Sequence, residues 1–243
     1  MPHTVSWFSA GVSSAVATRL AIDEIDEIIY THIDDQHEDT LRFVLECEAW
    51  FGKPVTVLQS PHKTVEHVIL TSGGKGFLNG PYGAPCTRIL KRRIRQEWEI
   101  DNPHPDLTYV WGMDANESKR ADRIIGAMPK QSHRFPLIEQ NIGKEEAHAI
   151  LTASGIERPA MYGMGYHNNN CVGCLKGGMG YWNKIRVDFP EVFAARAALE
   201  RKIGASCING TFLDELDPER GRQDGPIVAD CGIMCELQAL PDA

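Results

Sequence analysis

Near the start of the chain, residues 6–15 read Ser6-Trp7-Phe8-Ser9-Ala10-Gly11-Val12-Ser13-Ser14-Ala15. The stretch predicts a strand that runs into a glycine-containing turn and then into a helix. Unpaired backbone N–H groups and the helix dipole make a helix N-terminus attractive to anions. Gly11 permits a close backbone approach, and the serines supply hydroxyl donors. The turn from Ser9 to Ser14 is therefore predicted to bind phosphate groups.

Two common phosphate motifs are excluded. The stretch lacks the Gly-Lys-Ser/Thr ending of a Walker A loop and the three glycines of a dinucleotide fingerprint. A serine-rich helix cap remains the alternative reading. The position of the stretch in the chain favours nucleotide binding, because nucleotides bind at the first strand–loop–helix unit of an open parallel sheet.

The rest of the chain alternates between strand and helix patterns. Strands are expected at 4–8, 27–33, 54–58 and 107–111, and helices at 13–22, 37–51, 64–70, 117–127, 143–153 and 190–203. Such alternation predicts an α/β fold with a doubly wound, mainly parallel, Rossmann-like sheet. Composition changes after about residue 155, where Asn, Gly and Cys become frequent. We therefore expect a nucleotide-binding domain over 1–155 and a cysteine-bearing C-terminal extension over 156–243, packed on the same domain.

Composition narrows the function classes. Of 243 residues, 42% are hydrophobic and 24% charged, which is ordinary for a globular protein. A net charge of −8 does not favour non-specific binding to nucleic acid or anionic membranes. No secretory signal or membrane-length apolar run is visible, so we expect a cytoplasmic protein with no membrane partner. The oligomeric state is not predicted. Five cations form a local exception that is either a solvated helix face or a polyanion contact: Arg88, Lys91, Arg92, Arg93 and Arg95.

Several segments of the chain resemble motifs of one protein family and follow one another in the same order as in that family. The turn Ser9-Ala10-Gly11-Val12-Ser13-Ser14 resembles the PP-loop Ser-Gly-Gly-x-Asp-Ser of the adenine nucleotide α-hydrolase superfamily, with Ala10 in place of a glycine and Ser13 in place of the aspartate. Residues 111–120, Trp-Gly-Met-Asp-Ala-Asn-Glu-Ser-Lys-Arg, resemble the Gly-x-Arg-x-x-Glu-Ser-x-x-Arg segment of the phosphoadenosine-phosphosulfate (PAPS)-reductase-like family, without its first arginine.

That resemblance implies an adenine nucleotide alpha-hydrolase-like fold and a set of nucleotide contacts. The contacts are Ser9, Ala10, Gly11, Ser13, Ser14, Asp34, Asp35, Glu117 and Arg120. Asp34 and Asp35 follow the second expected strand, where they either hold Mg²⁺ near the phosphates or cap the turn. Glu117 and Arg120 either contact nucleotide or form an i, i+3 ion pair.

The cysteines suggest a metal centre. Cys171-Val172-Gly173-Cys174 has the spacing that lets two thiolates bind one metal. In iron–sulfur members of the family, a Cys-Cys pair before a basic helix joins such a motif to hold a 4Fe–4S cluster. Pro85 replaces one member of that pair here, so the resemblance implies Cys86, Cys171 and Cys174 as ligands. Either one iron stays open for exogenous sulfide, or a fourth ligand comes from Cys207, Cys231, Cys235 or His167.

The tail carries a further candidate. Asp230-Cys231-Gly232-Ile233-Met234-Cys235 resembles the Glu-Cys-Gly-x-His tail of sulfonucleotide reductases, in which the cysteine attacks sulfur. Cys231 matches that nucleophile, and Met234 replaces the histidine. Two alternatives stay open: a structural zinc site formed by Cys171, Cys174, Cys231 and Cys235, or cysteines without a ligand. Cys47 is expected in the core, since cysteine buries readily.

Three functions follow from these patterns. The first is an ATP-dependent sulfurtransferase that adenylates a nucleic-acid or sulfur-carrier acceptor, with Cys174 and the metal centre in catalysis. The second is a reductase of adenylyl sulfate or its 3′-phosphate, which uses Cys231 and a thioredoxin-type reductant. The third is a non-catalytic module that binds ATP or a related adenine nucleotide, which the replacement of the loop aspartate by Ser13 favours.

Overall fold

A computed structural model of the chain describes residues 2–72, 76–79 and 83–222. Its internal contacts divide the chain into two compact units. The first unit contains the chain up to His32 together with His37–Gln59 and Ile94–Asn169. The second contains Ile33–Gln36, Ser60–Arg93 and the chain from Asn170 onward.

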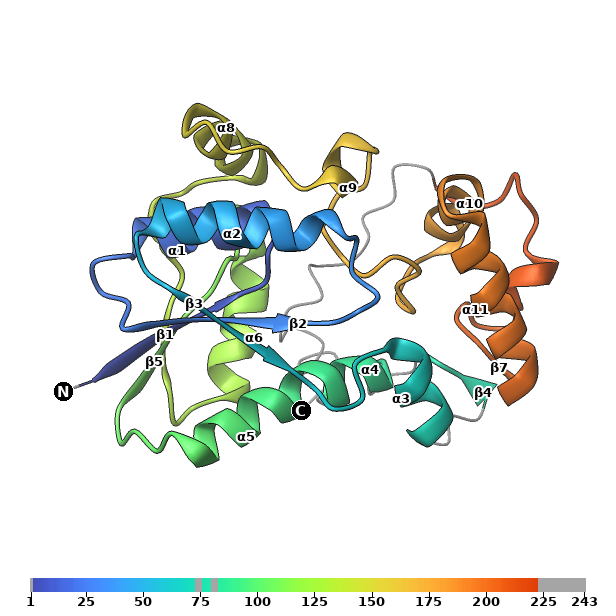
Figure 1. Cartoon of the computed structure of the whole chain (residues 1–243), viewed down its shortest axis with the longest axis horizontal. Coiled ribbons are helices and arrows are strands. Elements are labelled where there is room, and N and C mark those ends of the chain that lie inside the picture. The colour runs from blue at the N-terminus through green and yellow to red at the C-terminus, as the bar shows by residue number, and fades with distance from the viewer. Residues whose placement is uncertain (1, 73–75, 80–82, 223–243) are drawn as a thin grey trace. The chain divides into compact units, whose positions relative to one another are not determined.

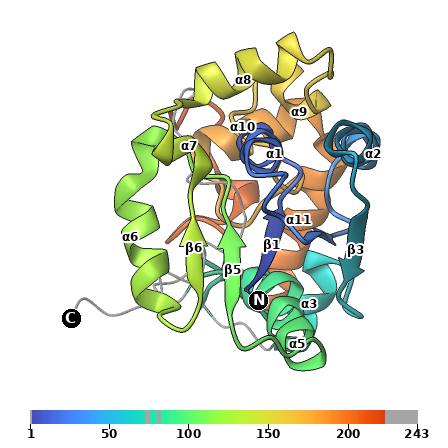
Figure 2. The same cartoon turned by 90° about the vertical axis from the view of Figure 1, so that its left-hand side faces the viewer.

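The first unit is built on a five-stranded parallel sheet, part of which faces the viewer in Figure 2. The spatial order is β3-β2-β1-β5-β6. The strands are β1 (His3–Phe8), β2 (Glu27–His32), β3 (Val55–Gln59), β5 (Leu107–Val110) and β6 (Ser132–Arg134). This arrangement confirms the predicted doubly wound α/β fold at the level of its sheet.

Helices cover both faces of this sheet. Figure 1 shows α1 and α2 on one face and α5 on the other. Val12, Val16 and Phe43 are buried on the first face and form one hydrophobic core with Phe8 of β1. The helical elements of this unit are α1 (Val12–Leu20), α2 (Asp39–Phe51), α5 (Arg93–Asp101), η2 (Ala115–Glu117), α6 (Ser118–Ala127), α7 (Pro136–Glu139), α8 (Lys144–Ala153) and α9 (Ala160–Gly163).

The strand order places a topological switch point at β1. The chain proceeds outward from β1 to β2 and β3, and later strands add on the opposite side of β1 through β5. In open parallel sheets, ligands bind beyond the carboxyl ends of the two strands that flank such a point. A ligand site in this unit is therefore expected at the segments that follow β1 and β5.

The second unit is mainly helical. Its elements are α3 (Val65–Ser72), β4 (Gly76–Phe77), α4 (Pro85–Thr87), the π-helical turn η1 (Arg88–Arg92), α10 (Met179–Asp188), α11 (Pro190–Ile203), β7 (Ala205–Ser206) and η3 (Leu213–Glu215). The strands β4 and β7 pair in parallel. Glu200 of α11 is fully buried, and its carboxylate accepts the backbone N–H groups of Cys207 and Leu213, so it fixes the chain after β7.

Several elements were not expected from the sequence, and β6 and α10 are two of them. The strand β6 has only three residues, Ser132, His133 and Arg134, which carry no alternating apolar pattern, and it is defined by its pairing with β5. Helix α10 begins at Met179, in the part of the chain where Asn, Gly and Cys become frequent and where only the helix at 190–203 was expected. None of the helices in the described part of the chain combines the length and the apolar character needed to cross a membrane.

Candidate functional site

The predicted phosphate loop lies at the switch point. Strand β1 ends at Phe8, α1 begins at Val12, and Ser9, Ala10 and Gly11 connect them. Ala10 has φ 58°, the left-handed region that costs a non-glycine residue about 1–2 kcal/mol. Its side chain is fully buried in the core, which holds this conformation in place. Strained backbone of this kind persists mainly at binding loops and other functional positions.

One hydroxyl organises the loop. The Oγ of Ser14 accepts hydrogen bonds from the Ser9 N–H (3.2 Å), the Gly11 N–H (3.3 Å) and the Ser9 Oγ–H (2.9 Å). The same hydroxyl donates to the Gly11 carbonyl at 2.9 Å. Three donors from the loop thus converge on one oxygen at the N-terminus of a nine-residue helix. Convergent donors of this kind suit an oxyanion, and the Ser14 hydroxyl occupies their common focus in this structure.

The segment after β5 packs against this loop. A Cβ added to Gly112 would lie 2.3 Å from the Ser14 Cα and 2.7 Å from its backbone nitrogen, so only glycine fits there. Farther along, Asp114 caps η2 by accepting the Asn116 N–H at 2.9 Å. The Ser9–Ser14 loop and residues 111–120 therefore pack against each other where Gly112 meets Ser14.

Glu117 and Arg120 form the ion pair that was one of their two predicted roles. Glu117 also accepts the backbone N–H of Asp114 at 3.2 Å, which completes a capping box. Both side chains thus have structural partners at the start of α6. Their predicted contact with nucleotide stays a prediction.

A buried amide supports the loop from the other side. Asn169 donates from Nδ2 to the Ala10 carbonyl at 2.9 Å and to the Thr40 hydroxyl at 3.2 Å. Asn169 and Thr40 are both almost completely buried. The Tyr162 hydroxyl accepts the N–H of Val12, the first residue of α1, at 3.4 Å. These contacts hold the left-handed residue and the helix start.

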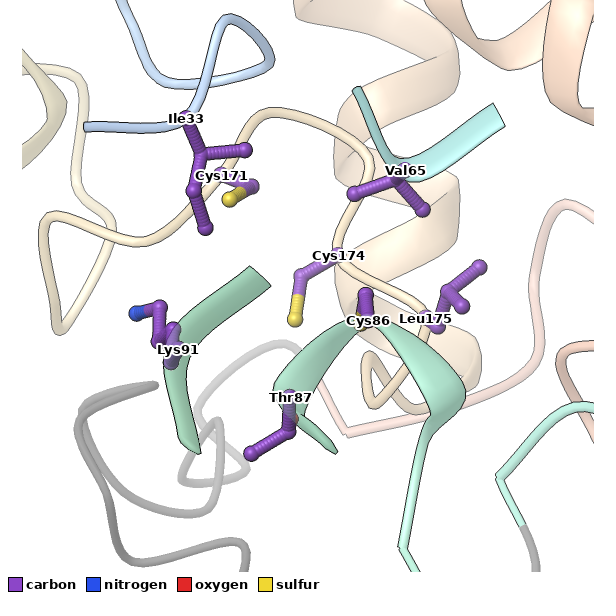
Figure 3. Close-up of a pocket in the computed structure, with 8 residues that line it drawn as sticks. All are labelled: Ile33, Val65, Cys86, Thr87, Lys91, Cys171, Cys174 and Leu175. Atoms are coloured by element: carbon purple, nitrogen blue, oxygen red, sulfur yellow. The ribbon is translucent and has the colours of Figure 1, made fainter. Parts of the chain in front are cut away.

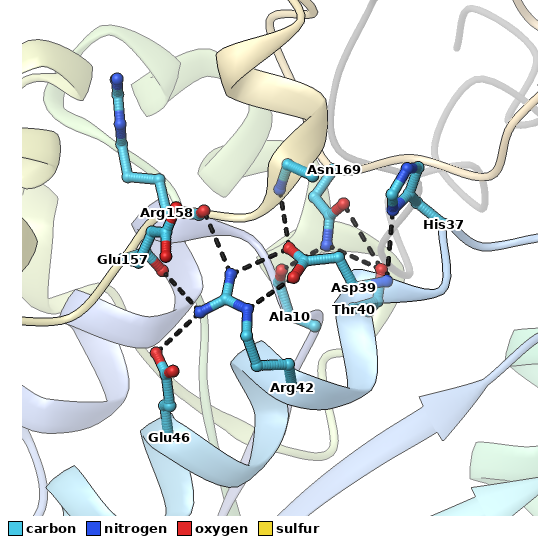
Figure 4. A network of polar contacts seen from close by, with 10 residues as sticks. Ala10, His37, Asp39, Thr40, Arg42, Glu46, Glu157, Arg158 and Asn169 are labelled. Atoms are coloured by element: carbon cyan, nitrogen blue, oxygen red, sulfur yellow. Dashed lines mark hydrogen bonds and ion pairs between the residues drawn. The ribbon is translucent and has the colours of Figure 1, made fainter.

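An ionic network fixes the start of α2 beside this region (Figure 4). Asp39 accepts two hydrogen bonds from Arg42, and its Oδ2 accepts the Ala160 N–H at 2.7 Å. Arg42 also donates to the carbonyls of Glu157 and Arg158. The Arg42 guanidinium holds the pKa of the Asp39 carboxyl below its usual value. The network joins α2 to the chain that leads into α9.

Asp34 and Asp35 belong to the second unit. Asp35 accepts the Val65 N–H at 2.7 Å through Oδ2 and pairs with Arg196 at 3.3 Å through Oδ1. Both of its carboxylate oxygens therefore have protein partners, which accounts for this side chain without Mg²⁺. Asp34 is exposed, and its N–H donates to the Lys63 carbonyl at 3.2 Å.

Three predicted metal ligands line one cavity of the second unit. Cys86, Cys171 and Cys174 surround it in Figure 3. The remaining lining residues are Ile33, Val65, Thr87, Lys91 and Leu175. Cys86 lies on α4, directly before the π-helical turn η1, and π-turns occur often at functional sites. Lys91 also lines the cavity, and a cation there would offset the negative charge of cysteine thiolates.

These residues fit a thiolate-held metal by the chemistry of their donors. Sulfur ligands suit zinc and iron–sulfur centres. The cavity measures about 10 Å³, roughly one water-sized sphere, so a single ion fits with less rearrangement than a four-iron cluster. No three His, Cys, Asp or Glu side chains in the described ranges already have the arrangement of a metal site. Metal binding thus requires the thiols to turn toward a common point.

The other cysteines divide into two groups. Cys47 is fully buried in the core of the first unit, as predicted, and its burial raises the pKa of the thiol. Burial and the nearby Glu200 carboxylate raise the pKa of Cys207, which disfavours the thiolate needed for a fourth ligand. The predicted nucleophile Cys231 and the predicted ligand Cys235 lie outside the described residues. His167 lies at the surface, and its carbonyl accepts from Lys144.

The cluster of five cations separates by environment. Arg95 is buried and forms an ion pair with Glu99, so it belongs to the protein interior. Arg88 and Arg93 are exposed. Only part of the basic sequence is thus placed to meet an external anion.

Three supporting residues had weak sequence signals. Gly112 lies inside the segment 111–120 and Asn169 lies just before the Cys171–Cys174 motif, but their contacts depend on segments that meet only in the folded chain. Tyr181, which contacts the Cys171–Cys174 turn, belongs to no recognisable sequence pattern.

Compared with models of known protein families and with curated protein sequences, the chain matches none.

Proposed function

We propose that this chain is a PP-loop enzyme, similar to the PAPS-reductase-like family, that binds an adenine nucleotide on the Ser9–Ser14 loop and uses ATP for sulfur transfer. The observation that carries the proposal is the location of the loop. It follows the central strand β1 at the switch point of a parallel sheet and touches the segment after β5 through Gly112. Nucleotide sites of open α/β sheets form at such points.

In the proposed reaction, ATP first activates an acceptor oxygen. The oxygen attacks the α-phosphorus, the bond to the bridging oxygen of the β-phosphate breaks, and pyrophosphate leaves. A sulfide ion then attacks the activated carbon, the carbon–oxygen bond breaks, and AMP leaves with the oxygen. The loop would bind the phosphates through the amides of Ser9 and Gly11, with the Ser14 hydroxyl turning to donate. Fixed donors of this kind stabilise charge that develops on phosphate oxygens.

The three cysteines that line one cavity support a metal centre as part of this function. Cys86, Cys171 and Cys174 would hold it, and Lys91 would offset the negative charge of the thiolates. When bound, a thiolate-ligated metal supplies a site that attracts sulfur ligands. The exposed Arg88 and Arg93 favour a polyanionic acceptor such as a nucleic acid, since arginines bind phosphate groups.

The experiment uses the full chain purified without oxygen. Its iron, zinc and sulfide contents are measured, and it is incubated with α-labelled ATP, sulfide and a nucleic-acid fraction. We expect AMP and pyrophosphate as products, and their loss in Cys174→Ser together with the metal. The variant Cys47→Ala, which changes a cysteine of the core, should retain both the metal and the formation of AMP and pyrophosphate. Release of ADP would contradict the proposal.

The same preparation separates the remaining candidates. Thioredoxin-dependent reduction of adenylyl sulfate, without ATP turnover, would instead identify a sulfonucleotide reductase. Nucleotide binding without any product would identify a non-catalytic module.

A further inference from the structure

The Cys171–Cys174 turn is unusually constrained. Gly173 has φ 73°, a conformation that favours glycine. A Cβ at this position would also lie 2.8 Å from Cγ1 of Val192 on α11. Cys171 and Cys174 are themselves buried. The turn therefore packs closely against Val192 of α11 and has room only for glycine at position 173.

One side chain holds both ends of this turn. The Tyr181 hydroxyl accepts the Cys174 N–H at 2.9 Å and donates to the Cys171 carbonyl at 3.1 Å. Tyr181 lies on α10 and is 8% exposed. Two buried backbone groups are thus satisfied by one oxygen, and leaving both without a partner would carry a desolvation cost.

The sequence next to Tyr181 is adapted to its ring. A Cβ on Gly177 would lie 1.9 Å from Cδ1 of Tyr181, so any other residue at 177 would displace the ring. The neighbouring Gly178 has nothing within 4 Å of an added Cβ. The need for glycine is therefore specific to the position under the tyrosine.

The opposite edge of the turn is also anchored. The Val172 N–H donates to the Asp35 carbonyl at 2.8 Å, and Cys171 forms an isolated bridge with Gln36. The Asp35 carboxylate is in turn fixed by Val65 and Arg196. Main-chain contacts thus secure one side of the turn, and the Tyr181 hydroxyl secures the other.

We propose that Tyr181 is a positioning residue that presets the backbone of the Cys171–Cys174 turn, so that only the thiol groups have to turn when a metal arrives. This role rests on the proposed metal centre, although Tyr181 would contact no metal itself. Groups that orient metal ligands typically contribute 10- to 100-fold to metal affinity. The hydroxyl does so here by fixing the backbone that carries the two sulfurs.

The test deletes only the hydroxyl. Tyr181→Phe and wild type are titrated with Zn²⁺ against a chromophoric chelator, and hydrogen exchange is followed in the peptide that contains residues 171–181. We expect about 10- to 100-fold weaker Zn²⁺ binding and faster exchange in this peptide without metal. The control is Tyr30→Phe, which removes a buried hydroxyl bonded to His32 in the first unit and should leave both readouts unchanged.

A second pair of variants distinguishes a loss of positioning from a general loss of stability. Gly177→Ala should mimic Tyr181→Phe by displacing the ring, whereas Gly178→Ala should not. A variant that unfolds earlier but gains the same thermal shift from Zn²⁺ as wild type would overturn the positioning role. Equal Zn²⁺ affinity and equal exchange in Tyr181→Phe would also overturn it.

The two proposals fail separately. If wild type binds neither Zn²⁺ nor iron, the metal centre fails. Tyr181 is then judged by exchange alone, where faster exchange in Tyr181→Phe supports its hold on the turn and unchanged exchange refutes it.

Discussion

At the scale of single residues, hydrogen bonds from a few side chains shape both candidate sites. Ser14 gathers the donors of the phosphate loop, and Asn169 holds the carbonyl of the strained Ala10. The Tyr181 hydroxyl bonds to backbone groups of both Cys171 and Cys174 in the cysteine turn. Each acts on main-chain groups, so its importance depends on geometry that a residue pattern does not encode.

His148 provides a pH-dependent prediction at this scale. Burial, together with Arg158 and Lys144, lowers the pKa of His148 to about 4 from an ordinary 6.5. Arg158 donates to its Nδ1 at 3.2 Å, so the neutral ring carries its proton on Nε2, and the ring meets Tyr162 edge-on. The depressed pKa means that the unfolded chain binds the proton first as the pH falls.

We therefore expect stability to be highest above pH 6.5 and to fall as the pH decreases from about 6.5 toward 4. Urea unfolding across this range checks it, with His148→Gln as the comparison that should lessen the decline. Direct NMR titration of the imidazole tests the cause. A midpoint near 6.5 in the folded protein would refute it.

At the scale of elements, the Asp39–Arg42 pair joins α2 to the segment before α9. Asp39→Ala removes the acceptor of the Ala160 N–H and leaves Arg42 without its main partner. We expect a loss of about 1–3 kcal/mol in the free energy of unfolding, measured by denaturant titration near neutral pH. Asp122→Ala, on the exposed face of α6, is the control and should change it by no more than about 0.5 kcal/mol.

The same pair carries a pH signature. Because the folded pKa of Asp39 is lowered by Arg42, its contribution is present above pH 3.8 and is lost as the pH falls through the lower folded value. The difference between wild type and Asp39→Ala should therefore shrink in acid. A difference that stays constant below pH 3 would contradict the ion pair as its source.

The helices and strands also show which parts of the structure could be predicted from the sequence. The alternation of strands and helices predicted the parallel sheet, and Ser9–Ser14 was correctly predicted to join the first strand to the first helix. Strand β6 was missed because Ser132-His133-Arg134 carries no alternating apolar pattern, and only its pairing with β5 defines it as a strand. The convergence of Cys86 with Cys171 and Cys174 on one cavity was expected from the resemblance and could not be derived from spacing across 84 residues.

At the scale of the whole molecule, the two candidate sites belong to different units. The phosphate loop lies in the first unit and the cysteine cavity in the second. Sequence alone could not assign 60–93 to the second unit, because membership depends on tertiary contacts such as the pairing of β4 with β7. A ligand that binds only the folded form of one unit stabilises that unit by mass action.

Separate ligands should therefore leave separate footprints in hydrogen exchange. We expect ATP to slow exchange in residues 8–20 and 111–118, and Zn²⁺ to slow it in 84–92 and 171–181. Mass spectrometry of the full chain with each ligand alone checks this. Protection of 171–181 by ATP with no effect on 8–20 would place the nucleotide elsewhere.

Calorimetric titration of ATP into three proteins tests most directly whether the Ser9–Ser14 loop binds the phosphates of the nucleotide. Gly112→Ala would place a Cβ 2.3 Å from the Ser14 backbone, whereas Gly126→Ala in α6 meets nothing within 4 Å. We predict that wild type and Gly126→Ala bind ATP equally and that Gly112→Ala, although folded, binds at least tenfold more weakly, a cost of about 1.4 kcal/mol. Equal binding by all three proteins, or no binding by wild type, would contradict the account.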